Sequence, residues 1–203
     1  MGLVPRFYDA TEGEVLVYGK NVNDYDIERL RSDIAVVMQK TVLFSGSVRD
    51  NIRWGKRDAT DEEIYKALEA AQVKDVIDDK GEGLDFKIAQ DGKNLSGGQK
   101  QRISIARALV RQPKILILDD SSSALDYATD AVLRKSLKAL DKDMTVIVVS
   151  QRTSSIRYSD KILVLDDGRA VGFGTHDELL SGCEVYREIH NSQYGGKGVD
   201  LNA

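Results

Sequence analysis

Three runs of consecutive apolar residues constrain the fold of this chain more than any other feature. They lie at residues 34–38, 115–118 and 146–149, and none alternates between apolar and polar side chains. A strand with one face in water alternates, whereas a strand covered on both faces does not. Helical patterns separate the runs, so the sequence predicts an α/β fold built on a buried parallel sheet.

Capping signals and turn residues predict the remaining elements. Thr60 with Glu63 and Thr175 with Glu178 form capping boxes, and Ser47 and Ser96 are further N-cap candidates. We also expect a strand at 14–18, helices at 126–140 and 184–192, and a hairpin that turns at 167–168. Residues 1–4 have the pattern of the apolar end of a helix that Pro5 stops.

Composition removes several classes of protein. The 203 residues carry 29 Lys+Arg against 33 Asp+Glu, a net charge of −4, which argues against nucleic acid as a partner. The single cysteine, Cys183, cannot form an internal disulfide and fits a reducing compartment. No apolar run approaches the roughly 20 residues of a membrane-spanning helix, so we expect the chain itself to be soluble.

A Gly-containing octet at residues 95–102, Leu-Ser-Gly-Gly-Gln-Lys-Gln-Arg, precedes an amphipathic helix. Glycine at a helix start is costly unless the backbone must approach another group closely. Free N–H groups at a helix start bind phosphate. Ser-Gly-Gly alone fits an ordinary turn before a helix, but the whole octet is more specific because a strand ending in two aspartates follows about twenty residues later.

Those aspartates, Asp119 and Asp120, directly follow the apolar run at 115–118. A buried strand ending in an acid delivers a carboxylate to Mg²⁺ at its tip. The alternative, an acidic cap for the next helix, is weaker because Asp126 is already a cap candidate.

Together these motifs resemble the nucleotide-binding domain of ATP-binding cassette (ABC) transporters, in particular the exporter type, over essentially the whole chain. Residues 95–102 match the signature motif, Asp119 ends a Walker B strand, and residues 123–126 match the D-loop. Gln39 stands at the Q-loop position and Gln151 at the switch position, and residues 90–94 stand where exporters carry a cross-linking loop.

The resemblance implies a P-loop NTPase-like parallel sheet over residues 1–193, with a helical signature subdomain at about 44–112 and a disordered tail at 194–203. It implies ATP and Mg²⁺ as cofactors. Asp119 and Gln39 would contact the metal, and Asp120 and Gln151 would be catalytic. The ATP-binding residues would be Ser96, Gly97, Gly98, Gln99, Gln39 and Asp126. The implied partners are a second nucleotide-binding domain, packed head to tail, and transmembrane domains of the same parent chain, at the cytoplasmic face of the inner or plasma membrane.

Two residues depart from the family pattern. Asp120 stands where the family has Glu, and Gln151 stands where it has His. Asp is one methylene shorter than Glu, and Gln cannot titrate. Both departures resemble the degenerate subunit of heterodimeric exporters, whose own site hydrolyses ATP poorly while its intact signature serves the partner's site.

No G-x-x-x-x-G-K-[ST] motif occurs, because none of the Gly-Lys pairs at 19–20, 55–56, 92–93 and 196–197 has the required neighbours. In the family this P-loop precedes the segment that resembles residues 3–11, so we expect the chain to begin inside the P-loop helix, without the first strands. Two alternatives remain. The 203 residues alone neither bind nor hydrolyse ATP, or the chain belongs to a cassette ATPase that acts on DNA or in translation.

Overall fold

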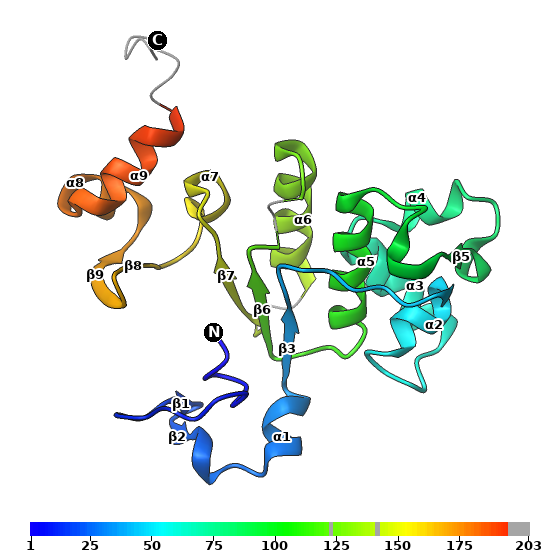
Figure 1. Cartoon of the computed structure of the whole chain (residues 1–203), viewed down its shortest axis with the longest axis horizontal. Coiled ribbons are helices and arrows are strands. Elements are labelled where there is room, and N and C mark those ends of the chain that lie inside the picture. The colour runs from blue at the N-terminus through cyan, green and yellow to red at the C-terminus, as the bar shows by residue number, and fades with distance from the viewer. Residues whose placement is uncertain (122–123, 141–142, 195–203) are drawn as a thin grey trace. The chain divides into compact units, whose positions relative to one another are not determined.

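The computed structural model describes residues 1–121, 124–140 and 143–194 (Figure 1). The chain divides into two compact units, residues 1–149 and 150–203. The strands of the first unit are β1 (Leu16–Val17), β2 (Lys20–Asn21), β3 (Ile34–Val37), β4 (Gly46–Ser47), β5 (Lys87–Ile88), β6 (Ile115–Asp119) and β7 (Thr145–Val149). Its α-helices are α1 (Ile27–Ser32), α2 (Val48–Arg53), α3 (Asp61–Ala70), α4 (Lys74–Asp78), α5 (Gly97–Leu109) and α6 (Tyr127–Leu140). Three short 3₁₀ helices are η1 (Val22–Asp24), η2 (Gly83–Asp85) and η3 (Gln90–Gly92).

The three apolar runs form one parallel sheet in the order β3-β6-β7, which confirms the predicted fold class. In register, Val37 of β3 pairs with Leu118 of β6, and Asp119 pairs with Val149 of β7. All three strands therefore end at the same edge of the sheet. The central strand β6 is buried along its apolar length, as its unbroken run predicted.

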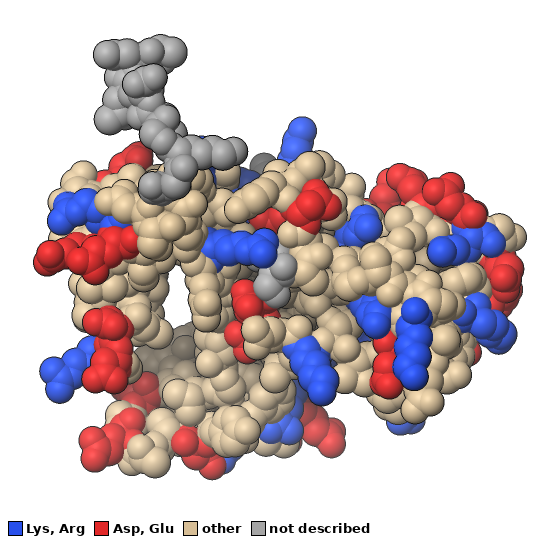
Figure 2. Space-filling view, turned by 45° about the horizontal axis from the view of Figure 1, so that its top comes forward, with Lys and Arg blue, Asp and Glu red and all other residues tan. Residues whose placement is uncertain are grey.

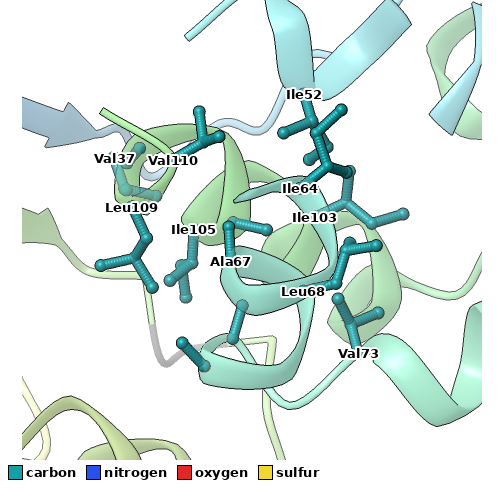
Figure 3. Packing of buried hydrophobic residues seen from close by; sticks show 14 of the residues in the cluster. Val37, Ile52, Ile64, Ala67, Leu68, Val73, Ile103, Ile105, Leu109 and Val110 are labelled. Atoms are coloured by element: carbon teal, nitrogen blue, oxygen red, sulfur yellow. The ribbon is translucent and has the colours of Figure 1, made fainter. Parts of the chain in front are cut away.

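The helices α2 and α3 pack against α5, which also contacts β3, and α4 packs against α3. Figure 3 shows Ile52, Ile64 and Ile103 meeting at one point of this core, and each is fully buried. Burying such a side chain contributes roughly 1.5–3 kcal/mol relative to exposure. Gly55 lies just after α2, at a position where no larger residue fits. A Cβ there would lie 2.0 Å from the Arg107 carbonyl oxygen of α5.

Both predicted capping boxes form, with bonds in each direction between Thr60 and Glu63 and between Thr175 and Glu178. Ser47 caps α2 through a reciprocal pair with Asp50. Local side-chain pairs of this kind stabilise a helix start without help from the rest of the fold.

The amino-terminal predictions need correction. No helix is assigned to residues 1–8; they form turns, with Phe7 N–H bonded to the Gly2 carbonyl (2.8 Å) and Arg6 N–H to that of Leu3 (3.2 Å). This is the Schellman pattern of a helix end, and the reversal comes at Arg6, whose φ is 53°, rather than at Pro5. The strand expected at 14–18 is only β1, because Tyr18 and Gly19, both with positive φ, turn the chain into β2.

The second unit contains α7 (Thr153–Ile156), the strands β8 (Ile162–Asp166) and β9 (Arg169–Gly174), α8 (His176–Gly182) and α9 (Glu184–Tyr194). The predicted hairpin joins β8 to β9 through Asp167 and Gly168, both with positive φ. Tyr194, which we placed in the tail, is the last residue of α9, and residues 195–203 lie outside the described part.

Two surface properties bear on function. Within the described residues, no helix combines the length and the apolar character needed to cross a membrane. Acidic and basic side chains are interspersed on the face shown in Figure 2, without a single large positive region.

Candidate functional site

Polar residues from two strands meet at the carboxyl edge of the parallel sheet. Gln39, just beyond β3, donates from Nε2 to the Asp120 Oδ2 atom at 2.8 Å, and Asp119 is the last residue of β6. The Asp120 backbone has a φ of 44°, and its N–H donates to the Val149 carbonyl at 2.9 Å. The fold thus brings together three of the predicted site residues, from segments 81 positions apart in the chain.

These residues fit Mg²⁺ as an ion that arrives with a nucleotide. The carboxylates of Asp119 and Asp120 and the amide oxygen of Gln39 are hard oxygen ligands, and Mg²⁺ commonly takes one or two carboxylates together with waters and phosphate oxygens. The described residues contain no cluster of three or more His, Cys, Asp or Glu side chains that could hold a metal by themselves. The edge can therefore supply part of a magnesium shell and leaves the rest to phosphate and water.

The signature residues form the start of α5. Ser96 Oγ accepts from the Gln99 N–H (3.2 Å), and Gln99 Oε1 accepts from the Ser96 N–H (3.0 Å). The N–H groups of Gly97 and Gly98 have no acceptor within the described residues. No acidic residue lies in the first turn. This helix end therefore presents two free donors, the Ser96 hydroxyl hydrogen and the positive end of the helix dipole, which suits a phosphate group.

Gly98 lies so close to the segment before α6 that there is little room for a side chain. A Cβ on Gly98 would lie 3.2 Å from the Ala124 carbonyl oxygen and 3.4 Å from Leu125 Cδ2, whereas one on Gly97 would meet only Ala124 Cβ at 3.8 Å. The two glycines of the predicted signature motif therefore serve different purposes. Gly97 leaves the helix start open, and Gly98 lets it pack on residues 124–125.

Asp126 was predicted to be both a helix cap and an ATP-binding residue, and it does cap α6. Its Oδ1 accepts from the Thr129 N–H at 2.9 Å and its Oδ2 from Thr129 Oγ1 at 2.8 Å. These bonds, the backbone one foremost, hold the pKa of Asp126 below its usual value. Its ATP-binding role stays a prediction. Ser123, the first residue of the predicted D-loop, lies outside the described residues.

Gln151 belongs to the second unit and is exposed there. Its carbonyl oxygen accepts from Gln193 Nε2 of α9, and Thr153, two residues later, is buried and begins α7. The segment that carries the predicted switch residue is thus held at its backbone by a side chain of α9.

Sequence reasoning missed a polar network that anchors the segment following Gln39. Asn51 of α2 is fully buried, accepts from the Phe44 N–H (3.0 Å) and donates to the Phe44 carbonyl (2.9 Å). Arg107 of α5 donates from Nη2 to Asn51 Oδ1 and from Nη1 to the Val42 carbonyl, both at 3.0 Å. The network joins residues 42–44 to the helices α2 and α5.

Burial lowers the pKa of Arg107 from its ordinary value, because the surrounding helices remove water from the guanidinium group. The sequence did carry a signal for this residue. Arg107 follows Ile103 by four positions and Ala106 by one, so a charged side chain borders the apolar face of α5. Partly buried arginines in such positions are bound by carbonyl oxygens or acids.

The comparisons with known proteins agree with this geometry. A family model described as ABC transporter matches residues 2–123, more than half of the chain. This chain belongs to the ABC transporter family. A solved structure described as a bacterial Atm1-family ABC exporter with ATP bound superposes with a TM-score of 0.90 and 37% identity, over 95% of this chain and 34% of that one.

Relatives of known sequence point the same way. A Staphylococcus aureus protein, named as a multidrug export ATP-binding/permease protein, is 42% identical over 95% of this chain and 33% of its own length. The uncharacterized ABC transporter ATP-binding protein YfiB of Bacillus subtilis is 44% identical over 98% of this chain and 34% of its own. The chain thus spans about a third of the length of these relatives and has the fold of an exporter nucleotide-binding domain.

Proposed function

We propose that this chain is the nucleotide-binding part of an ABC exporter and that it couples ATP binding and hydrolysis to transport across a membrane. It would act at the cytoplasmic face of that membrane, packed head to tail on a second nucleotide-binding domain. ATP would lie between the Asp119 edge of one domain and the signature helix α5 of the other. Mg²⁺ would supply charge neutralisation at the phosphates when bound.

The hydrogen bond between Gln39 and Asp120 carries the proposal. It joins the end of β3 to the end of β6 at 2.8 Å, where the γ-phosphate and its metal would lie in such a domain. The carboxylate and amide oxygens at this edge can bind the metal, and the Gln39 amide N–H can reorient toward water or phosphate. No stretch of the 203 residues has a P-loop pattern, so the contribution of these residues is the metal edge and the signature helix.

We further propose that the site formed at this chain's own sheet edge is the weaker of two unequal sites. Asp120 is one methylene shorter than Glu, and its carboxylate accepts a hydrogen bond from Gln39. A displacement of about 1 Å in a positioning group costs on the order of 10²-fold in rate. The intact helix start at Ser96, Gly97 and Gly98 would instead complete the partner's site, which implies a heterodimer.

Permease segments would dock at a shallow hollow of about 310 Å³ between the segment after β3 and the helices of the signature subdomain. Its wall includes Met38, Val42 and Trp54, and Trp54 is 67% exposed while it stacks on Phe44 at 4.7 Å between ring centroids. The basic residues Lys40, Arg107 and Arg111 also line the hollow, so an exposed aromatic residue lies beside a wall that is part apolar and part basic, which suits insertion of an amphipathic helical segment. The proposed occupant is a permease segment, because relatives three times as long as this chain are named as ATP-binding/permease proteins.

Two substitutions in the assembled exporter test whether the two ATP sites are unequal. Ser96→Ala removes a phosphate contact from the partner's competent site, so it should lower ATP hydrolysis more than Asp120→Ala, which alters only the weaker site. Equal losses, or a larger loss in Asp120→Ala, would contradict the unequal-site proposal. For the docking surface, Trp54→Glu should lower co-purification of the permease part expressed as a separate chain, whereas Tyr8→Glu, at a similarly exposed aromatic residue outside the hollow, should not.

A further inference from the structure

One side chain of α9 binds the backbone on both sides of Arg152, in the segment that carries the switch-position residue. Gln193 donates from Nε2 to the Gln151 carbonyl oxygen at 2.5 Å. Its Oε1 accepts from the Thr153 N–H at 2.9 Å and from Thr153 Oγ1 at 3.1 Å. The three bonds close a clamp on residues 151–153.

The chemistry of the clamp requires a carboxamide. A single planar group must donate to one carbonyl and accept from one amide at the same time, and Gln has both functions at the end of its side chain. Glu at this position would keep the acceptor for Thr153 and lose the donor for Gln151. Its carboxylate would also bring a negative oxygen toward the Gln151 carbonyl, so the two halves of the clamp can be separated experimentally.

The rest of α9 fixes where Gln193 lies. Tyr186, His190 and Gln193 follow one another at intervals of four and three, so they share one face of the helix. Tyr186 is buried, and its hydroxyl lies 2.9 Å from His176 Nδ1 of α8. His190 Nδ1 lies 3.2 Å from Thr153 Oγ1. The same face thus anchors the helix in the core of its unit and contacts the switch segment twice.

We propose that Gln193 is a positioning residue for Gln151. It rests on the proposed function and on the predicted switch role of Gln151, whose side chain would donate to the γ-phosphate of ATP. Gln193 touches neither nucleotide nor metal. By fixing the carbonyl of residue 151 and the amide of residue 153, it sets the direction in which the Gln151 carboxamide leaves the backbone.

The test uses the ratio of ATP to ADP affinity at this subunit's own site. Competition by ATP or ADP against photolabelling of this subunit with azido-ATP, in the assembled exporter, measures both affinities. Since only ATP has a γ-phosphate, Gln193→Glu should weaken ATP binding about ten- to a hundredfold, the value of one hydrogen bond to a charged group, and leave ADP binding unchanged. Asn191→Glu, an equal charge change at an exposed residue of the same helix, should change neither.

A double-mutant cycle separates the possible failures. In a Gln151→Ala background, Gln193→Glu should have no further effect, because the side chain that it positions is gone. Loss of ATP and ADP binding together in Gln193→Glu would indicate a structural role and overturn positioning. If Gln151→Ala weakens ATP while Gln193→Glu does not, or if the two effects multiply, Gln193 does not act through Gln151. If Gln151→Ala itself leaves the ATP to ADP ratio unchanged, the proposed role of Gln151 fails first.

Discussion

The Asn51→Ala substitution tests how the segment after Gln39 is held. The Asn51 side chain makes four hydrogen bonds: one with the Phe44 N–H, one each with the carbonyls of Phe44 and Ser47, and one with Arg107 Nη2. None of its surface is exposed. The substitution removes all four bonds and leaves the partner groups beside an apolar methyl.

The magnitude follows from what those partners can do instead. Each buried polar group left without a partner costs about 1–3 kcal/mol. Phe44 is partly exposed, and Arg107 keeps its bonds to the Asn51 backbone carbonyl and to the Val42 carbonyl, so water and the remaining contacts offset part of the loss. We expect Asn51→Ala to lower the free energy of unfolding by roughly 2–4 kcal/mol.

Urea unfolding followed by the fluorescence of Trp54, the only tryptophan, reports on this part of the chain. Asn94→Ala is the matched control. Asn94 also bonds one backbone N–H (3.0 Å) and one carbonyl (2.8 Å), but it is exposed, so its loss should cost about 1 kcal/mol or less. The reasoning would be refuted if Asn51→Ala destabilised the chain no more than Asn94→Ala.

Three further outcomes are expected. Gly55→Ala places a Cβ 2.0 Å from the Arg107 carbonyl oxygen, so it should destabilise the first unit by about 3 kcal/mol or more in the same urea assay; a loss below 1 kcal/mol would contradict that geometry. Burial, with His176 and Arg157 nearby, lowers the pKa of His190, so the unfolded state takes up the proton first and stability should fall as pH drops below about 6.5. Thermal unfolding of His190→Asn should show a weaker fall, and an unchanged pH dependence would exclude His190 as its source. Isothermal titration of the 203-residue chain should show very weak binding of Mg-ATP, and a micromolar dissociation constant would contradict this.

Elements with a purely local cause could be predicted from the sequence. The strands β3, β6 and β7 follow from unbroken apolar runs, and the capping boxes at Thr60 and Thr175 follow from residue pairs three positions apart. Neither pattern depends on distant parts of the chain. For the same reason the hairpin at Asp167 and Gly168 was placed correctly.

Turns in which a residue other than glycine adopts positive φ could not be predicted from the sequence. Arg6 and Tyr18 both adopt positive φ, which few side chains favour. The first places the end of the helical pattern at Arg6 rather than at Pro5, and the second shortens an expected strand. The division of the chain at residues 149–150 depends on contacts that no local pattern records.

The candidate site also contains residues that the sequence identified and residues that only the folded structure revealed. Gln39 and Asp120 were identified through motif resemblance, yet the bond between them joins residues 81 positions apart and needed the folded sheet. Asn51 and Arg107 were missed because they contact each other across 56 positions, and neither belongs to a motif that the sequence displays. Gln193 was missed for the same reason, since it reaches Gln151 from 42 positions away.

Whether α5 faces a nucleotide held by a second domain can be measured with a Ser96→Cys variant. The single native cysteine, Cys183, is 6% exposed, so the new thiol would be the accessible one. With a cysteine in the phosphate-binding loop of the partner domain, we predict a disulfide between the two chains that forms with Mg-ATP and is lost without nucleotide. No cross-link in Mg-ATP, or an equal yield in its absence, would contradict the proposal that this chain lends its signature helix to a partner's ATP site.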